Sequence, residues 1–182
     1  GYVKGKVGSG LKGCKIEFPS QSVGATANTI MAAVLAKGTT ELFNVAREPE
    51  IIDVCKCLKA MGCKIEGEGE SRIIIEGVDS LKETTHKVVM DRNELGTFII
   101  AGAITNSDIK LTGGNTALLE TFISKLNEVG VEIHQSEEYL QVKSTNSLAI
   151  KCTNILTEPF PGFPTDLQAQ MMALLSIADG VS

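Results

Sequence analysis

The chain has 182 residues, of which 43% are hydrophobic and 21% charged, and its 17 basic and 22 acidic side chains leave a formal net charge of −5. This is the composition of an ordinary globular protein, and the length allows one large domain or two small ones. The 5 prolines and 18 glycines are scattered along the chain, which excludes a disordered or fibrous protein. The acidity and the lack of tryptophan argue against a nucleic-acid partner, and the absence of a long apolar run or a leader predicts no membrane span and a cytoplasmic location.

The hydrophobic pattern of the first half predicts a strand, a helix, a strand, a helix and two further strands. In chain order these are Cys14–Phe18, Ala25–Ala36, Thr39–Phe43, Pro49–Met61, Lys64–Glu66 and Arg72–Glu76. The helix over Ala25–Ala36 is largely apolar, so we expect it to be buried. Pro49 and Gly62 are typical of the first and the last turn of the second helix.

This pattern repeats along the chain, since Leu58–Ile65 matches Leu126–Ile133. The second copy is predicted at Glu94–Ile104, Ile109–Thr112, Leu118–Val129, Val131–His134 and Tyr139–Val142, with Gly130 as a helix cap. A third copy begins with an apolar helix at Leu167–Ala178 and stops at Ser182. Each copy therefore reads as a strand-helix-strand-helix-strand-strand unit, and we expect either a fragment of a longer protein or completion by other chains.

Two stretches fall outside this repeat. Gly1–Lys12 is a glycine-rich lead-in that belongs to no visible unit, and Leu81–Lys87 is polar and weakly periodic. The second stretch is our candidate for a connection between units or domains.

The five cysteines are an odd number without a secretory leader, which favours reduced thiols over disulfides. Cys55, Cys57 and Cys63 lie close together, but residues two apart do not share a helix face and so cannot hold one ion together. We therefore expect buried thiols and no metal site.

Five further polar residues carry no predicted chemistry. Arg47, Glu48 and Glu50 form a charged cluster of the kind that is usually a solvated face or a set of structural ion pairs. His86 and His134 are isolated from any triad or ligand pattern, so neither receives a role.

Three segments lie where a loop opens a helix, a place that presents free backbone N–H groups to an anion. In the first, Ser20–Thr26, the hydroxyl of Ser22 and the small Gly24 suit a phosphate or diphosphate. The alternative is that Ser22 merely caps the helix and Gly24 relaxes a turn.

The second segment is Asp91–Glu94, whose spacing predicts a capping box. Arg92 within it can reach an anion or pair with a neighbouring carboxylate, and the spacing does not select between these two. The third is Pro159–Leu167, where three prolines make a rigid run that ends at Asp166. A carboxylate held at a helix start can accept a proton from a substrate hydroxyl. The alternative, given equal weight, is that Thr165 or Asp166 is an N-cap.

Several short sequence segments of the chain closely resemble motifs of the UDP-N-acetylglucosamine branch of the enolpyruvyl transferase family. The strongest are Ala46–Ile51 and Gly162–Gln170, joined by Ser22–Thr26, Asp91–Arg92 and Gly96–Phe98. The resemblance covers essentially all 182 residues. The related synthase that acts on shikimate 3-phosphate shares the fold but not these motifs.

The resemblance implies an α/β fold in which repeated strand-helix-strand-helix-strand-strand units form inside-out barrels. It implies that residues 1–89 are the last part of one domain and residues 90–182 the first part of the next, truncated in its second unit. The remainder of the enzyme chain would then be needed to complete the fold.

The resemblance also implies a reaction, namely transfer of the enolpyruvyl group of phosphoenolpyruvate to the 3-hydroxyl of UDP-N-acetylglucosamine with release of phosphate. This reaction is the first committed step of peptidoglycan synthesis and needs no metal or organic cofactor. On this view Ser20, Gln21, Ser22 and Val23 contact the UDP part beside Gly24, and Asp166 contacts and deprotonates the 3-hydroxyl.

The chain departs from the family at a few points. Many relatives have a lysine where this chain has Ser20 and an acidic residue where it has Ala27. The family's reactive cysteine would precede Gly1, and none of the five cysteines matches it, so we expect the chain alone to be inactive. The rival hypothesis is a non-catalytic module of the same fold that binds a nucleotide sugar or a partner protein.

Overall fold

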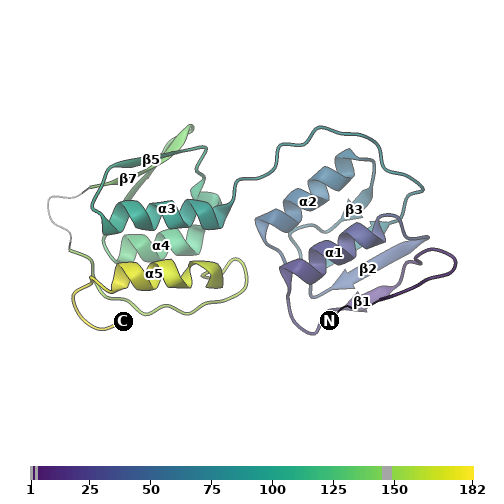
Figure 1. Ribbon diagram of the computed structural model, residues 1–182, viewed down its shortest axis with the longest axis horizontal. Coiled ribbons are helices and arrows are strands. Elements are labelled where there is room, and N and C mark those ends of the chain that lie inside the picture. Colours follow the sequence, from purple (N-terminus) through teal and green to yellow (C-terminus); the bar gives the residue numbers. More distant parts are fainter. Residues whose placement is uncertain (1, 3, 145–148) are drawn as a thin grey trace. The chain divides into compact units, whose positions relative to one another are not determined.

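The computed structural model describes residue 2, residues 4–144 and residues 149–182, and the chain divides into two compact units, Gly1–Val89 and Met90–Ser182. In both units helices pack against a small β-sheet, so the mixed α/β fold class is confirmed (Figure 1).

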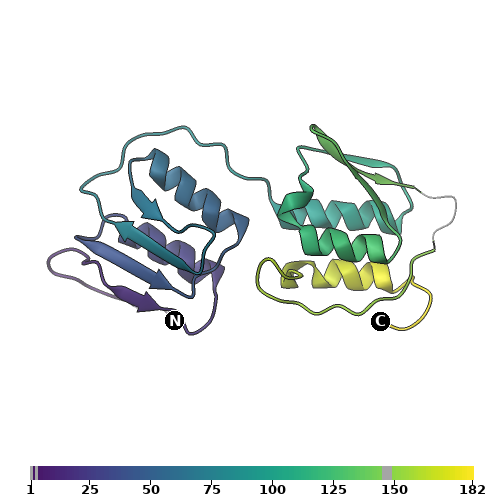
Figure 2. The same ribbon diagram turned by 180° about the vertical axis from the view of Figure 1, so that it is seen from behind.

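Unit 1 contains all six elements of the predicted repeat. They are β1 (Lys15–Glu17), α1 (Val23–Ala33), β2 (Thr39–Phe43), α2 (Pro49–Ala60), β3 (Lys64–Glu66) and β4 (Arg72–Glu76). The strands lie in the order β1-β2-β4-β3, with β1 parallel to β2 and the other pairs antiparallel. Both helices cover the same face of this sheet, as the front and back views show (Figures 1 and 2).

The core of unit 1 lies between this sheet face and the helices. Alternate residues of β4, Ile73 and Ile75, are fully buried, and they face the same core as Ile30 of α1. The expectation that the first helix is buried holds for one face only, because Thr26, Ile30 and Ala33 are buried whereas Met31 and Leu35 are 50% and 51% exposed.

Unit 2 contains α3 (Arg92–Ile104), β5 (Ile109–Thr112), the 3-10 turn η1 (Thr116–Leu118), α4 (Glu120–Glu128), β6 (Glu132–Gln135), β7 (Tyr139–Lys143), the 3-10 turn η2 (Thr165–Leu167) and α5 (Gln168–Leu175). Its antiparallel sheet has the order β5-β7-β6. Helices α3, α4 and α5 lie side by side in both views (Figures 1 and 2).

The second copy differs from the predicted unit in two ways. No strand forms in residues 77–91, so the first strand of the repeat is missing from this copy. The predicted helix Leu118–Val129 is interrupted at Leu119, whose φ of −141° separates η1 from α4.

The repeat is closest at the end of the second helix of each copy. Gly62 and Gly130 have φ angles of 101° and 96°, the left-handed region that favours glycine. The next amide in each copy, at Cys63 or Val131, donates back to Leu58 O at 3.0 Å or Leu126 O at 2.9 Å. Both predicted glycine caps are therefore confirmed.

The third copy begins earlier than its helix. Lys151 forms a parallel bridge with Asp179, as Lys12 does with Lys37 in unit 1. The lead-in Gly1–Lys12, of which residues 1 and 3 lie outside the described part, was expected to belong to no unit. Its end instead pairs with the chain after α1, so that expectation is wrong for Lys12.

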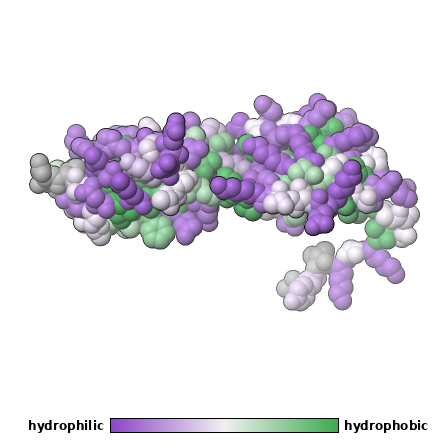
Figure 3. All heavy atoms as spheres, turned by 90° about the horizontal axis from the view of Figure 1, so that it is seen from above, coloured by the Kyte–Doolittle hydropathy of each residue, from purple (hydrophilic) through white to green (hydrophobic). Residues whose placement is uncertain are grey.

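Among the described residues, no helix is long and apolar enough to cross a membrane, and the longest, α3, has 13 residues. Seen from above, the surface is mostly hydrophilic with hydrophobic side chains scattered between (Figure 3). Met172 of α5 is one exposed apolar side chain, at 62%.

Candidate functional site

The first candidate segment lies between β1 and α1 of unit 1. Ser22 is the N-cap of α1, and its Oγ accepts a hydrogen bond from Ala25 N at 3.3 Å, so Ser22 does cap the helix. The hydroxyl proton of Ser22 is not used in this bond. Ser22 is exposed and can therefore still donate to an acceptor in solution.

Gly24 leaves the backbone of the first turn of α1 open. A Cβ atom at this position would meet nothing within 4 Å. The carbonyl oxygen of Gly24 accepts a hydrogen bond from Asn28 Nδ2 at 2.8 Å, so this carbonyl points toward the next turn of the helix, as helix carbonyls do. The start of α1 therefore offers exposed backbone to a ligand approaching along the helix axis.

A second loop lies beside the first. Since β1 and β2 are parallel neighbours, their carboxyl ends lie at the same end of the sheet, and the loops that lead into α1 and α2 both begin there. Asn44 Nδ2 donates to Phe18 O at 2.8 Å, and Ala46 N donates to the buried Thr26 Oγ1 at 3.0 Å. These two bonds fix the loop after β2 beside the start of α1.

This loop contains a buried carboxylate that the sequence analysis missed. Glu48 is only 8% exposed, and its Oε2 has no hydrogen-bond partner among the described residues. Of the two expectations for the charged cluster, the solvated face is therefore wrong for Glu48. The sequence does contain one signal for the burial of Glu48, namely its position between a buried strand and a helix that begins with Pro49.

The second candidate segment opens α3 in unit 2. Asp91 Oδ1 accepts from Asn93 N at 2.8 Å and Glu94 N at 3.2 Å, so the predicted cap at Asp91 is confirmed. Arg92 is 9% exposed and lines a hollow of about 20 Å³ beside the proline-rich run. That volume suits a single water molecule and not a substrate.

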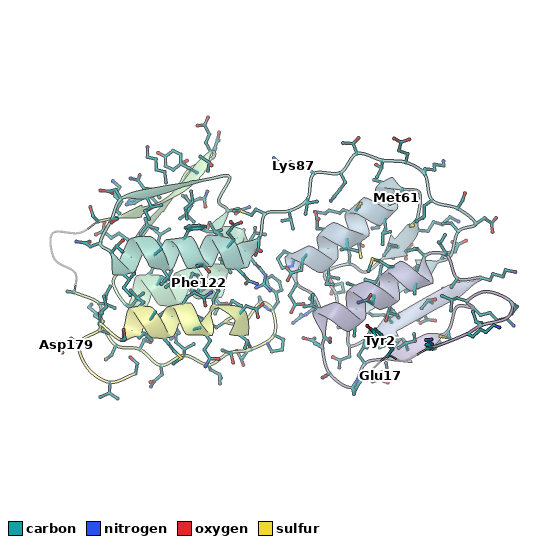
Figure 4. All side chains as sticks on the ribbon, in the orientation of Figure 1. Tyr2, Glu17, Met61, Lys87, Phe122 and Asp179 are labelled. Carbon is teal, nitrogen blue, oxygen red and sulfur yellow. The ribbon has the colours of Figure 1, made fainter. Side chains whose placement is uncertain are left out.

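The third candidate segment, Pro159–Leu167, is anchored by Phe163. This side chain is 2% exposed, and its ring centroid lies 5.6 Å from that of Phe122. Figure 4 shows Phe122 among the helices of unit 2. The run is also held by a hydrogen bond from Thr121 Oγ1 to Pro161 O at 2.5 Å. Its rigidity thus comes from packing as well as from proline.

Asp166 lies at the centre of η2, and the N-cap alternative for this segment is wrong. The residues that precede η2 and α5 are Pro164 and Leu167, and neither provides a side-chain cap. Asp166 is exposed, and its Oδ2 accepts from Asn93 Nδ2 at 3.0 Å. The structure therefore brings the second and third segments together in unit 2, whereas the first lies in unit 1.

The clustered cysteines have different environments. Cys55 is fully buried, and this burial raises the pKa of its thiol to about 11. Burial also raises the pKa of Cys63, whereas Cys57 is partly exposed. No group of three or more His, Cys, Asp or Glu side chains that could hold a metal is found in the described part of the chain.

His86 is not isolated, contrary to expectation. Its Nε2 lies 3.0 Å from Asp53 Oδ1 on α2, and both side chains are mostly buried. The pair joins the polar stretch after β4 to α2 within unit 1 and contains no nucleophile, so it is a structural contact.

Thiol labelling should separate the cysteines by exposure. In the native chain we expect Cys14 and Cys152, both exposed, to react with an aromatic disulfide reagent within minutes, because an accessible thiolate can attack the disulfide and release the aromatic thiolate. Cys55 and Cys63 should react only after unfolding. Mass spectrometry of the labelled peptides measures this, and early labelling of Cys55 would contradict its burial.

The chain is similar to known proteins over almost its whole length. The family model for EPSP synthase (3-phosphoshikimate 1-carboxyvinyltransferase) matches residues 2–182. Proteins named UDP-N-acetylglucosamine 1-carboxyvinyltransferase from Dinoroseobacter shibae and Ruegeria pomeroyi are 56% and 53% identical over 182 residues, which is 100% of this chain and 43% of each relative. The crystal structure of the enolpyruvyl transferase NikO from Streptomyces tendae shares the fold, with a TM-score of 0.83 at 21% identity over 94% of this chain and 43% of that one.

Proposed function

This chain belongs to the EPSP synthase family, and we propose that it is part of an enzyme that transfers an enolpyruvyl group from phosphoenolpyruvate to UDP-N-acetylglucosamine. The observation that carries the proposal is the name shared by relatives that are more than half identical over every residue of the chain. The chain spans less than half the length of these relatives, so the activity is proposed for the whole enzyme. Its place would be the first committed step of peptidoglycan synthesis, in the cytoplasm.

In this proposal the start of α1 binds the UDP part of the substrate. The backbone N–H groups around Ser22 and Gly24 and the positive end of the helix dipole face the diphosphate. Ser20, Gln21 and Val23 belong to the same binding loop. Ser20 carries no charge, so we propose that the diphosphate is held by the backbone amides of this loop and by the Ser22 hydroxyl.

Asp166 is the proposed base of the reaction. The substrate 3-hydroxyl adds to the phosphate-bearing carbon of phosphoenolpyruvate, its proton passes to the Asp166 carboxylate, and the methylene carbon gains a proton to give a tetrahedral intermediate. Loss of a proton from the resulting methyl group then restores the double bond as phosphate leaves. Two features support this role: the carboxylate is exposed, and the packed run before it fixes its position. No step in this proposal requires a metal or an organic cofactor.

Titration of the 182-residue chain with UDP-N-acetylglucosamine tests the binding loop. We expect the amide NMR signals of Ser22–Gly24 to shift first. Gly24→Ala should weaken binding about tenfold, because the added methyl group occupies the space through which the diphosphate reaches the amides. The same variant should not lower the free energy of unfolding, since the methyl meets no protein atom and alanine favours the helix.

Gly5→Ala is the matched control, because a Cβ there also meets nothing within 4 Å and the residue lies outside the loop. It should bind like the parent chain. Signal shifts confined to other segments, or equal affinity of the Gly24→Ala variant, would count against the loop.

A further inference from the structure

We infer that Asn93 is a positioning residue for Asp166, an inference that rests on the proposed role of Asp166 as the base. Its side-chain Nδ2 donates to Asp166 Oδ2 at 3.0 Å, across 73 residues of sequence. Asn93 therefore determines how the two carboxylate oxygens are oriented.

The Asn93 amide is itself fixed in place. Its residue is the second of α3, and its backbone N–H donates to Asp91 Oδ1 at 2.8 Å. The side-chain Oδ1 of Asn93 is buried and has no hydrogen-bond partner in the described part of the chain. Turning the amide over would place this oxygen against the Asp166 carboxylate, so the donor orientation is the one that the neighbours favour.

This contact leaves one carboxylate oxygen for the substrate. With Oδ2 of Asp166 engaged by Asn93, the side chain cannot rotate freely, and Oδ1 remains available to a hydroxyl. A general base acts only when its oxygen lies within hydrogen-bond reach of the proton that it takes. Holding that oxygen in one place therefore affects the rate of the reaction more than the affinity for the substrate.

A neighbouring contact provides a control. One turn further along α3, Thr97 Oγ1 accepts from Gln170 Nε2 at 3.0 Å, which joins α3 to α5 as the Asn93 contact joins α3 to η2. This second hydrogen bond does not involve Asp166. Thr97→Val removes this bond and also the one that Thr97 Oγ1 donates to the backbone oxygen of Asn93 at 2.7 Å, but it keeps the Asn93 side-chain donor. It should therefore leave kcat within about twofold of the parent value.

Asn93→Asp separates positioning from a structural role. An acidic residue in the first turn of a helix is favourable, so a residue that served only α3 should tolerate aspartate. Beside Asp166, however, the new carboxylate replaces a donor with a repelling charge. In the complete enzyme we expect kcat to fall at least about tenfold and KM for UDP-N-acetylglucosamine to stay within about twofold. Asn93→Leu, which removes the donor without adding charge, should also lower kcat.

The measurements are phosphate release over a range of sugar-nucleotide concentrations and thermal unfolding of each variant. A kcat of Asn93→Asp within twofold of the parent, while Asp166→Asn abolishes turnover, would overturn this inference and leave the proposed function standing. An unchanged kcat in Asp166→Asn would instead overturn the proposed function. If kcat of Asn93→Asp fell no further than kcat of Thr97→Val, positioning by Asn93 would also be refuted.

Discussion

Replacing Asp166 with asparagine in the complete enzyme should lower kcat by about 10²–10⁴-fold, the contribution that a positioned general base makes. Asparagine has the same shape as aspartate and cannot take up the proton of the attacking hydroxyl. The exposed position of Asp166 in η2 means that the substitution removes no buried contact, so the fold should be kept. Phosphate release measures the rate, and thermal unfolding checks the fold.

Asp179→Asn is the matched control for this experiment. Asp179 is also exposed and lies beyond the other end of α5, and its backbone N–H donates to Ile150 O at 3.0 Å. Its kcat should equal that of the parent. If Asp166→Asn retained full turnover as well, Asp166 would have no role as a base. The expected inactivity of the 182-residue chain alone stays a prediction.

The strands of the sheets were predicted almost to the residue. β2, β4 and β5 have the expected bounds, because each is a short β-branched or apolar run bounded by glycine or polar residues. The strand expected at the start of the second copy does not form, although the repeat required it. Repetition in sequence indicates a shared ancestor element, but a strand forms only where burial and pairing stabilise it.

The local features of the candidate site were also predictable. The cap at Asp91 follows from its spacing to Glu94, and the rigid run before Asp166 follows from its prolines. Contacts between distant segments were not predictable. Asn93 and Asp166 meet only because α3 packs against η2, and no spacing rule relates residues that tertiary packing brings together.

Phe122→Ala should lower the free energy of unfolding of unit 2 by about 3–5 kcal/mol, the range for removing a buried aromatic side chain. Phe122 is fully buried in the core of unit 2. Phe98 of α3 is the matched control, because it is 49% exposed, and Phe98→Ala should cost about 1 kcal/mol. Tyrosine fluorescence during urea unfolding reports on unit 2 through Tyr139 of β7, since Tyr2 is 98% exposed already.

The loss should reach the candidate base as well as the core. The Phe122 ring packs on that of Phe163, three residues before Asp166, and so holds the proline-rich run in place. With alanine at 122 the run loses this anchor, and kcat of the complete enzyme should fall even at temperatures where unit 2 remains folded. Equal stability of the Phe122→Ala and Phe98→Ala variants would mean that the core of unit 2 does not depend on this ring pair. A destabilised variant with unchanged kcat would instead mean that proline alone keeps Asp166 in position.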